Sequence, residues 1–247
     1  MIAIMGYGFV GKGTEYLLQI CGYTNQVQIH DPAQGHTVTN WEHVEYAFVC
    51  VPTPESETGD LDLSILTEVY QQLLDNDVTP IIRSTIGPDQ VAQFPEAIMM
   101  PEFLREANWV KDVEEITTVI LGGDGTEKLE RIFTGKTVIH TDPVTAMMYK
   151  LSRNALLATK VILANQIKTV CERLDADYTE LVKLFNNNNT LGQTHWDVPG
   201  PDGKLGFGGK CFPKDISHMS TLYGDDQDNI FNFVKNLNNT LRGDNNG

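Results

Sequence analysis

The chain begins with Met1-Ile2-Ala3-Ile4-Met5-Gly6-Tyr7-Gly8-Phe9-Val10-Gly11, a short apolar run followed directly by the pattern G-x-G-x-x-G. The run predicts a buried strand, and the glycines after it predict a tight turn into a helix. In such a turn Gly6 permits the bend, Gly8 lets the backbone approach a pyrophosphate, and Gly11 lets the helix pack closely on the strand. We therefore expect a dinucleotide site at Gly6, Gly8, Phe9, Val10 and Gly11.

An acidic residue should follow this pattern by roughly 20 positions, at the end of the second strand, where it accepts hydrogen bonds from a ribose diol. Asp31 occupies that place, and no Lys or Arg follows it immediately. A 2′-phosphate would therefore lack a cation to neutralise it, which favours NAD over NADP. The alternative is a glycine turn that serves packing alone.

Further along the chain, short apolar runs alternate with helical patterns as far as about residue 141. Buried runs of this kind predict a parallel sheet covered on both faces. The expected strands are 2–5, 27–30, 47–51, 80–83, 98–100, 118–121 and 137–140. A long helical pattern over 142–174 follows, with Asp142 as its N-cap and Pro143 in its first turn. We predict an α/β, Rossmann-like, doubly wound parallel sheet (1–141), followed by an all-helical domain with a long central helix (142–247).

Composition excludes several classes of function. Lys and Arg number 18 against 33 Asp and Glu in 247 residues, a net charge of -15. Nucleic acid and anionic membrane surfaces are therefore poor partners, because no basic cluster could neutralise their phosphates. The four cysteines show no metal-ligand spacing and fit a reducing compartment, so no metal is expected. Without a signal peptide or a long apolar run, we expect a cytoplasmic protein.

A second glycine-rich motif is Gly206-Phe207-Gly208-Gly209-Lys210-Cys211-Phe212-Pro213-Lys214-Asp215. Pro213 suits the first turn of a helix, so Cys211 should lie near a helix N-terminus and beside two lysines. That setting favours the thiolate and makes the cysteine nucleophilic. The other cysteines fall in helical or strand patterns and are expected to be structural: Cys21, Cys50 and Cys171.

This second motif resembles the catalytic-cysteine signature of the UDP-glucose/GDP-mannose dehydrogenase family, in particular of its UDP-glucose 6-dehydrogenases. Four other segments resemble motifs of that family in the same order: Val51-Pro52-Thr53-Pro54, Arg83-Ser84-Thr85, Pro101-Glu102-Phe103-Leu104-Arg105-Glu106 and Lys150-Leu151-Ser152-Arg153-Asn154. The resemblance extends from residue 1 to about residue 242.

The resemblance implies an NAD-dependent oxidation of a nucleotide sugar at C6, from alcohol through aldehyde to carboxylate. Cys211 would add to the aldehyde and carry a thiohemiacetal and then a thioester, because a thiol is both nucleophile and leaving group. Lys150 and Asn154, one helical turn apart, would hold the sugar oxygen and stabilise an oxyanion. Asp215 would assist proton transfer, and Glu106 with Thr85 would orient the hydrolytic water.

The resemblance also assigns binding residues. Substrate contacts are implied for Glu102, Phe103, Leu104, Lys150, Asn154 and Gly208, and NAD contacts for Thr53, Thr85, Glu106 and Lys214. Without the motif around them, Glu102 and Glu106 would be interpreted as an exposed i,i+4 pair on a helix, and Lys150 and Asn154 as a solvated helix face.

The sequence also departs from the family pattern. We expect a short form that lacks the second Rossmann-like, UDP-binding domain of the family. The helix that usually follows the second strand should be trimmed, because little chain separates Asp31 from Ala47. Asn189-Thr190-Leu191-Gly192 stands where relatives commonly carry an arginine. UDP-glucose is the expected substrate and a homodimer through the long helix the expected assembly. GDP-mannose, another nucleotide sugar, and a non-catalytic binding remnant stay open.

Overall fold

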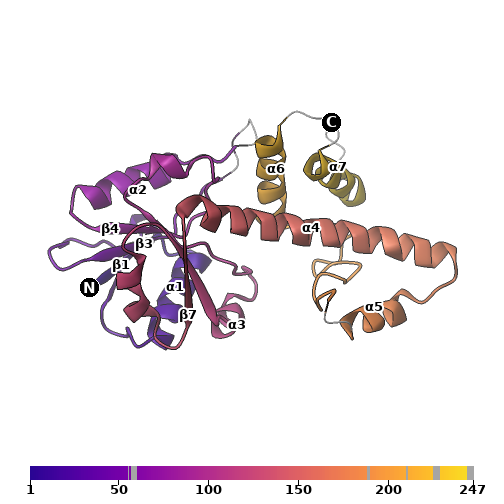
Figure 1. Ribbon diagram of the computed structural model, residues 1–247, viewed down its shortest axis with the longest axis horizontal. Coiled ribbons are helices and arrows are strands. Elements are labelled where there is room, and N and C mark those ends of the chain that lie inside the picture. Colours follow the sequence, from indigo (N-terminus) through magenta and orange to yellow (C-terminus); the bar gives the residue numbers. More distant parts are fainter. Residues whose placement is uncertain (55, 57–59, 188–189, 210, 225–228, 244–247) are drawn as a thin grey trace. The chain divides into compact units, whose positions relative to one another are not determined.

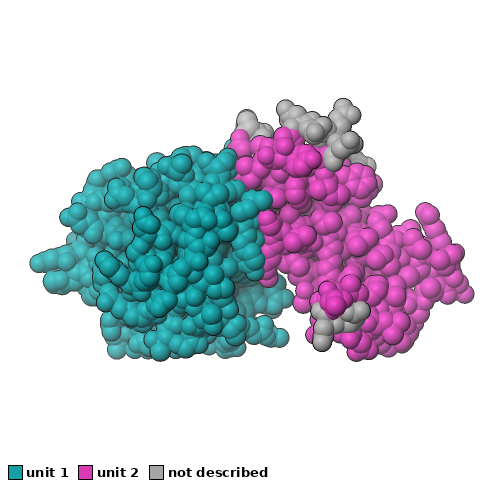
Figure 2. All heavy atoms as spheres, in the orientation of Figure 1, with its two compact units in different colours: residues 1–56, 61–150 teal, residues 57–60, 151–247 magenta. Residues whose placement is uncertain are grey.

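The computed structural model describes residues 1–54, 56, 60–187, 190–209, 211–224 and 229–243. It divides into two units (Figure 2): residues 1–56 with 61–150, and residues 57–60 with 151–247. The long helix α4 (Pro143–Arg173) contributes residues to both. We keep the domain boundary after residue 141 as a proposal. No helix within the described part of the chain is both long and apolar enough to cross a membrane.

The first unit is built on a seven-stranded sheet in the order β2-β1-β3-β4-β5-β6-β7. Figure 1 shows the unit with β1, β3, β4 and β7 labelled. The strands agree with the seven apolar runs to within one or two residues at each end. Their bounds are β1 Ile2–Met5, β2 Val27–His30, β3 Tyr46–Val49, β4 Thr79–Ile82, β5 Ile98–Met99, β6 Thr118–Gly122 and β7 Thr137–Thr141. The Rossmann-like α/β fold predicted from the sequence is thereby confirmed.

One strand pair departs from the predicted parallel sheet. β5 and β6 pair antiparallel at Met99 and Gly122, whereas every other neighbouring pair of strands is parallel. The connection from β5 to β6 therefore begins and ends at the same end of the two strands, and needs no crossover back to their other end. It contains a short helix, α3 (Trp109–Glu114).

Helices cover both faces of the sheet. Alternate residues of each strand point to opposite sides, and the apolar side chains on each side pack on the helices there. On one face, Ala3 and Met5 of β1 pack with α2 (Ser64–Leu74) and the start of α4. On the other, Ile2 and Ile4 pack with α1 (Phe9–Ile20), α3 and the 3-10 helix η3 (Thr126–Phe133). The helix usual after β2 is reduced to the 3-10 turn η1 (Pro32–Gln34), as expected. One further turn, η2 (Val91–Gln93), precedes β5.

The second unit is helical and is organised along α4. Asp142 caps this helix, since its Oδ1 accepts a hydrogen bond of 2.9 Å from Thr145 N. Three helices follow: α5 (Tyr178–Asn186), α6 (Cys211–Tyr223) and α7 (Ile230–Arg242). The core of the unit joins α4, α6 and α7 through Leu151, Ala155, Ala158, Ile162, Phe207, Ile216, Met219 and Val234.

Candidate active site

The first glycine turn has one open position between two packed ones. Gly6 has a φ of +88°, and a Cβ there would lie 2.9 Å from the Cys50 carbonyl oxygen. A Cβ on Gly11 would collide with the Gly6 carbonyl oxygen. Gly8, by contrast, would have no atom within 4 Å of an added Cβ, and as N-cap of α1 it makes no side-chain hydrogen bond. The helix N-terminus at Gly8 is thus suited to an anion such as a pyrophosphate.

Asp31 closes this turn from the end of β2. Its Oδ2 accepts hydrogen bonds of 2.8 Å from Tyr7 N and from Gln34 Nε2. The Tyr7 N–H is the largest of the contacts that hold the pKa of the Asp31 carboxyl below its usual range. An ionised carboxylate therefore lies beside the glycine turn, as a ribose diol requires. Phe9 and Val10 pack their side chains on the core, so their backbone N–H groups are what they can offer a phosphate.

Two threonines meet at the carboxyl ends of β3 and β4. Thr53 Oγ1 donates a hydrogen bond of 2.7 Å to the Thr85 carbonyl, and both residues are buried. Ser84 ties the same two segments together, because its Oγ donates to the Val51 carbonyl at 2.7 Å. The V-P-T-P and R-S-T motifs therefore form one site at the edge of the sheet where ligands of open α/β folds bind.

A buried ion pair joins two further motifs. Lys150 Nζ lies 2.6 Å from Glu102 Oε1 and donates to the Glu102 carbonyl at 3.1 Å, while Leu104 N donates to Glu102 Oε2 at 2.7 Å. Burial raises the pKa of Glu102, but the Lys150 ammonium and the Leu104 N–H outweigh it, so the pKa lies below its usual range. Neither Glu102 nor Lys150 belongs to a solvated helix face, since both are buried.

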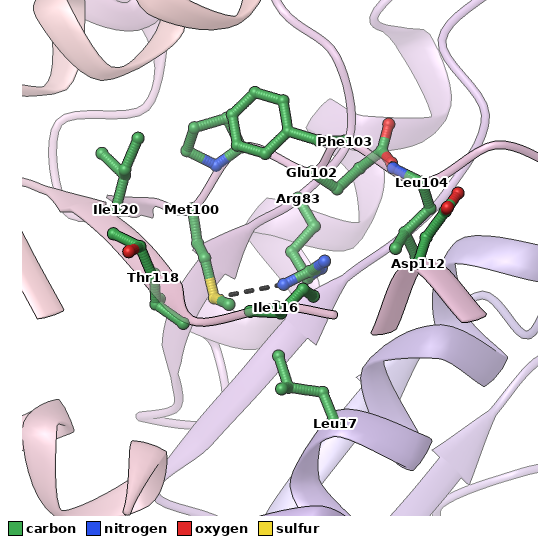
Figure 3. Close-up of a pocket in the computed structure, with 12 residues that line it drawn as sticks. Leu17, Arg83, Met100, Glu102, Phe103, Leu104, Asp112, Ile116, Thr118 and Ile120 are labelled. Atoms are coloured by element: carbon green, nitrogen blue, oxygen red, sulfur yellow. Dashed lines mark hydrogen bonds between the residues drawn. The ribbon is translucent and has the colours of Figure 1, made fainter. Parts of the chain in front are cut away.

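Sequence reasoning missed Arg83 as a functional candidate. Its side chain is buried at the end of β4, and Nη1 donates to Met100 Sδ at 3.3 Å (Figure 3). Its charge also helps to lower the pKa of Glu102. A cavity of about 60 Å³ lies beside it, lined by Met100, Glu102, Leu104 and other residues. The available signal was a cation at the end of an otherwise apolar run, directly before Ser84-Thr85.

The remaining residues of the P-E-F-L-R-E segment differ in exposure. Phe103 is half-buried, and its ring packs edge-on against Tyr149 with 5.6 Å between centroids. Glu106 is exposed in the turn before α3, whereas Thr85 is buried. The joint action of Glu106 and Thr85 on a water therefore stays a prediction.

Cys211 differs from the other three cysteines. It is the first residue of α6 and is half-buried, while Cys21, Cys50 and Cys171 are all buried. Burial raises the pKa of the Cys50 thiol to about 11, which makes that thiol a poor nucleophile. Lys210, expected to favour the Cys211 thiolate, lies outside the described residues, as does Asn189 of the loop that departs from the family pattern.

Asp215, four residues after Cys211, is buried in a polar contact with α4. Asn154 Nδ2 donates to Asp215 Oδ2 at 2.6 Å. Lys214 Nζ lies 3.8 Å from Asp215 Oδ1. Arg153 Nη1 donates to Asn154 Oδ1 at 3.4 Å and so orients the amide. Asn154 of the K-L-x-x-N motif is thus joined to the cysteine motif inside the second unit.

Gly208 of the second glycine motif faces a cation of its own chain. A Cβ there would lie 2.6 Å from Arg242 Nη2 and 3.0 Å from Asp202 Oδ2. The space beside Gly208 is therefore filled by α7 on its Cβ side. Elsewhere, the described residues contain no group of three or more His, Cys, Asp or Glu that could hold a metal ion.

Comparison with known proteins finds two domains of one family. The NAD binding domain of the UDP-glucose/GDP-mannose dehydrogenase family matches residues 33–136, and the central domain of the same family matches residues 144–240. A UDP-glucose 6-dehydrogenase of Rickettsia bellii is 29% identical over 230 residues, covering 84% of this chain and 52% of the relative. A GDP-mannose 6-dehydrogenase of Pseudomonas syringae is 28% identical over 209 residues, covering 73% and 47%.

A solved structure of a related enzyme is similar to this chain in fold. A UDP-glucose dehydrogenase from Pyrobaculum islandicum superposes with a TM-score of 0.79 at 19% identity, covering 97% of this chain and 68% of that one. At this identity the likeness concerns the fold alone. The chain spans about half the length of the curated relatives it matches.

Proposed function

The chain belongs to the UDP-glucose/GDP-mannose dehydrogenase family, and we propose that it oxidises a nucleotide sugar at C6 with NAD, using Cys211 as the nucleophile of the second oxidation. The expected substrate is UDP-glucose and the expected product UDP-glucuronate. The reaction removes two hydrides in turn, and the oxygen of one water enters the final carboxylate.

The observation that supports this proposal most is the buried contact between Asn154 and Asp215. A hydrogen bond of 2.6 Å joins two motifs that are far apart in the sequence. Asp215 lies one turn after Cys211 on α6. Cys211 is half-buried, whereas the other three cysteines are buried. A nucleophile at a helix N-terminus, with a buried carboxylate one turn away and an amide that orients it, suits covalent catalysis at a carbonyl.

Lys150 and Glu102 would act on the sugar oxygen. Glu102 orients the Lys150 ammonium through the 2.6 Å contact between Oε1 and Nζ. An oriented ammonium and the Asn154 amide, four residues apart on α4, can stabilise the negative oxygen formed when Cys211 adds to the aldehyde. Asp215 would hold or move the proton, and Glu106 with Thr85 would orient the water that cleaves the thioester.

NAD would be held at the N-terminus of α1 and by Asp31, and when bound it supplies the hydride acceptor for each oxidation. Two features of the chain fit this cofactor: the open side of Gly8 and the ionised Asp31 carboxyl. Thr53, Thr85, Glu106 and Lys214 are the further residues that we propose to contact it.

The stoichiometry of NADH formation tests the reaction. Purified protein with excess NAD should form two NADH per UDP-glucose consumed. Cys211→Ala should lose this stoichiometry, because no thioester can form, whereas Cys171→Ala should keep it, because Cys171 lies buried in α4. Running the same assay with GDP-mannose identifies the preferred nucleotide sugar.

Two results would contradict the proposal. One NADH per sugar in the unsubstituted protein would exclude the thioester route. NAD binding without turnover of any nucleotide sugar would favour a binding module that has lost the reaction.

We also propose a homodimer through α4. Apolar side chains recur on this helix at a spacing of seven residues and are strongly exposed: Leu156 at 71%, Leu163 at 51% and Val170 at 50%. Such a spacing keeps the three side chains along one side of a helix, which a second copy can cover. Leu163→Glu should convert a dimer to a monomer in light scattering, and a monomeric unsubstituted protein would contradict this proposal.

A further inference from the structure

The glycine-rich loop before Cys211 is held by two buried asparagines. Gly206 N donates to Asn165 Oδ1 at 3.2 Å, and Phe207 N donates to Asn238 Oδ1 at 2.7 Å. Asn165 belongs to α4 and Asn238 to α7, and both are about 95% buried, with exposed fractions of 4% and 5%. Two consecutive backbone N–H groups of the loop are thus taken up by carboxamides of two different helices.

Arg242, in the last turn of α7, holds the same loop at two further points. Its Nη1 donates to the Leu205 carbonyl at 3.3 Å, and its Nη2 lies 2.7 Å from Asp202 Oδ2. The Arg242 side chain is 15% exposed and the Asp202 side chain 45%, so this contact lies at the rim of the unit. Side chains of α4 and α7 therefore contact the loop at Asp202, Leu205, Gly206 and Phe207.

The glycines of the loop show which of its sides is packed. A Cβ on Gly206 would collide with Asn238 Oδ1, and a Cβ on Gly208 would lie 2.6 Å from Arg242 Nη2. A Cβ on Gly209 would have no atom within 4 Å. The loop therefore turns Gly206 and Gly208 toward α7 and leaves the neighbourhood of Gly209, two residues before Cys211, open.

Buried carboxamides have a cost that apolar side chains of similar size would avoid, unless their hydrogen bonds are made. Leucine would fill these positions without that cost, but it could not accept an N–H from the loop. The oxygen atoms of Asn165 and Asn238 are therefore explained by the conformation they impose on Gly206 and Phe207, since helix packing alone does not need them.

We propose that Asn165, Asn238 and Arg242 are positioning residues, which hold the glycine-rich loop so that its open side meets the nucleotide sugar. They act through the loop backbone and do not themselves touch the substrate. This inference rests on the proposed function, because it takes the loop beside Cys211 as part of the substrate site.

The test combines amide exchange with steady-state kinetics. Asn238→Ala removes the acceptor, Asn238→Asp keeps an acceptor oxygen in place, and Asn236→Ala alters an exposed asparagine of the same helix as a control. In Asn238→Ala, exchange at Phe207 N–H should accelerate by roughly five- to tenfold, the factor that one hydrogen bond is worth. KM for UDP-glucose should rise by a similar factor, while KM for NAD stays unchanged.

Asn238→Asp should restore much of both values, and Asn236→Ala should match the unsubstituted protein in each. Arg242→Ala is the second variant in case Asn238→Ala fails to fold, because it removes contacts at the end of α7 and leaves the helix core intact. It should raise KM for UDP-glucose in the same direction, with the KM for NAD again unchanged.

Several outcomes separate this inference from the proposed function. Faster exchange at Phe207 with an unchanged KM for UDP-glucose would overturn the positioning role and leave the enzyme intact. Equal changes in the KM values for both substrates would also overturn it, because they would indicate a general loss of structure. Unsubstituted protein that neither binds nor oxidises UDP-glucose or GDP-mannose would overturn the proposed function, and this inference with it.

Discussion

The two glycine-rich segments of the chain, 6–11 and 206–209, look alike at first. Each begins with a glycine of positive φ, Gly6 at +88° and Gly206 at +71°. In each, added side-chain atoms would strike the protein at two glycines and meet open space at another, which is Gly8 in the first and Gly209 in the second. Both therefore pair a packed side with an open one, as a loop that approaches a ligand requires.

The two segments differ in the contacts that hold them in place. Backbone of the adjoining strand and one nearby carboxylate hold the first segment, since Gly6 N donates to the His30 carbonyl at 2.9 Å and Tyr7 N donates to Asp31 Oδ2 at 2.8 Å. Side chains from distant helices hold the second, through Asn165, Asn238 and Arg242. The geometry of the first motif thus depends on the pairing of β1 with β2, whereas that of the second depends on how α4 and α7 pack.

The largest effect is expected for Gly11→Val. The new Cβ would strike the Gly6 carbonyl, which is backbone and cannot move aside, so helix α1 must shift away from β1. Overpacking of this kind costs about 3 kcal/mol of the free energy of unfolding. Urea denaturation measures it, with Lys12→Ala, an exposed neighbour, as the control. A loss no greater than that of the control would mean that α1 is not tied to the glycine turn.

A smaller loss is expected for Gly206→Ala. The new Cβ would meet the Asn238 side chain, which can rotate away, so the main cost is the positive φ, about 1–2 kcal/mol. Rotation of Asn238 would also free the Phe207 N–H, and amide exchange there should accelerate. Unchanged exchange at Phe207 would contradict the claim that side chains hold the second segment.

Acid should loosen the contact between Asp31 and Tyr7 in the first segment and leave the contact between Asn238 and Phe207 in the second in place. The pKa of Asp31 is lowered by the Tyr7 N–H, so the contact is fully present above the unfolded pKa of about 3.9 and is lost as the pH falls through the lower, folded pKa. Asn165 and Asn238 do not titrate. The amide resonance of Tyr7 should therefore shift on acidification below about pH 4 while that of Phe207 does not.

Asp31→Asn supplies the control for this titration, because it keeps an acceptor oxygen but removes the ionisable group. The acid shift of Tyr7 should disappear in that variant. If Tyr7 and Phe207 shift together in the unsubstituted protein, the acid transition is global, and the two segments do not differ in the way that we describe.

The smallest effect on stability is expected for Gly8→Ala. A Cβ there has no neighbour within 4 Å, and the backbone at Gly8 has an ordinary negative φ of -71°. The free energy of unfolding should fall by less than about 1 kcal/mol, the cost of a poorer N-cap. NAD affinity should nevertheless fall by roughly tenfold, or about 1.4 kcal/mol, since the methyl group occupies the side we assign to the pyrophosphate. Unchanged affinity would contradict that assignment.

Much of the fold could be predicted from local patterns. The sequence predicts all seven strands, the long helix and the reduced connection after β2, because buried strands and capped helices leave short-range signals. It does not predict the direction of β6. Antiparallel pairing at Met99 and Gly122 depends on where the chain returns after α3, and no nearby residue encodes that.

Some features of the candidate site could likewise be predicted from the sequence, and others could not. The motifs singled out Glu102 and Lys150, but their 2.6 Å contact required the fold to bring two segments together. Arg83 was quoted within its motif without a role, since a buried cation is noticed as such when its surroundings are known. The hydrogen bonds of Asn165 and Asn238 to Gly206 and Phe207 could not be predicted either, because an asparagine within a helical pattern carries no signal for a distant loop.

Local sequence alone thus determines where the glycine turn and the strands form and which side chains are chemically active, because residues a few positions apart signal each of them. The partners of those side chains depend on tertiary structure. Lys150 contacts Glu102, Asn154 donates to Asp215, and the second glycine loop donates to Asn238 of α7. These contacts form because the packing of distant helices and strands buries polar groups, which must then be hydrogen-bonded.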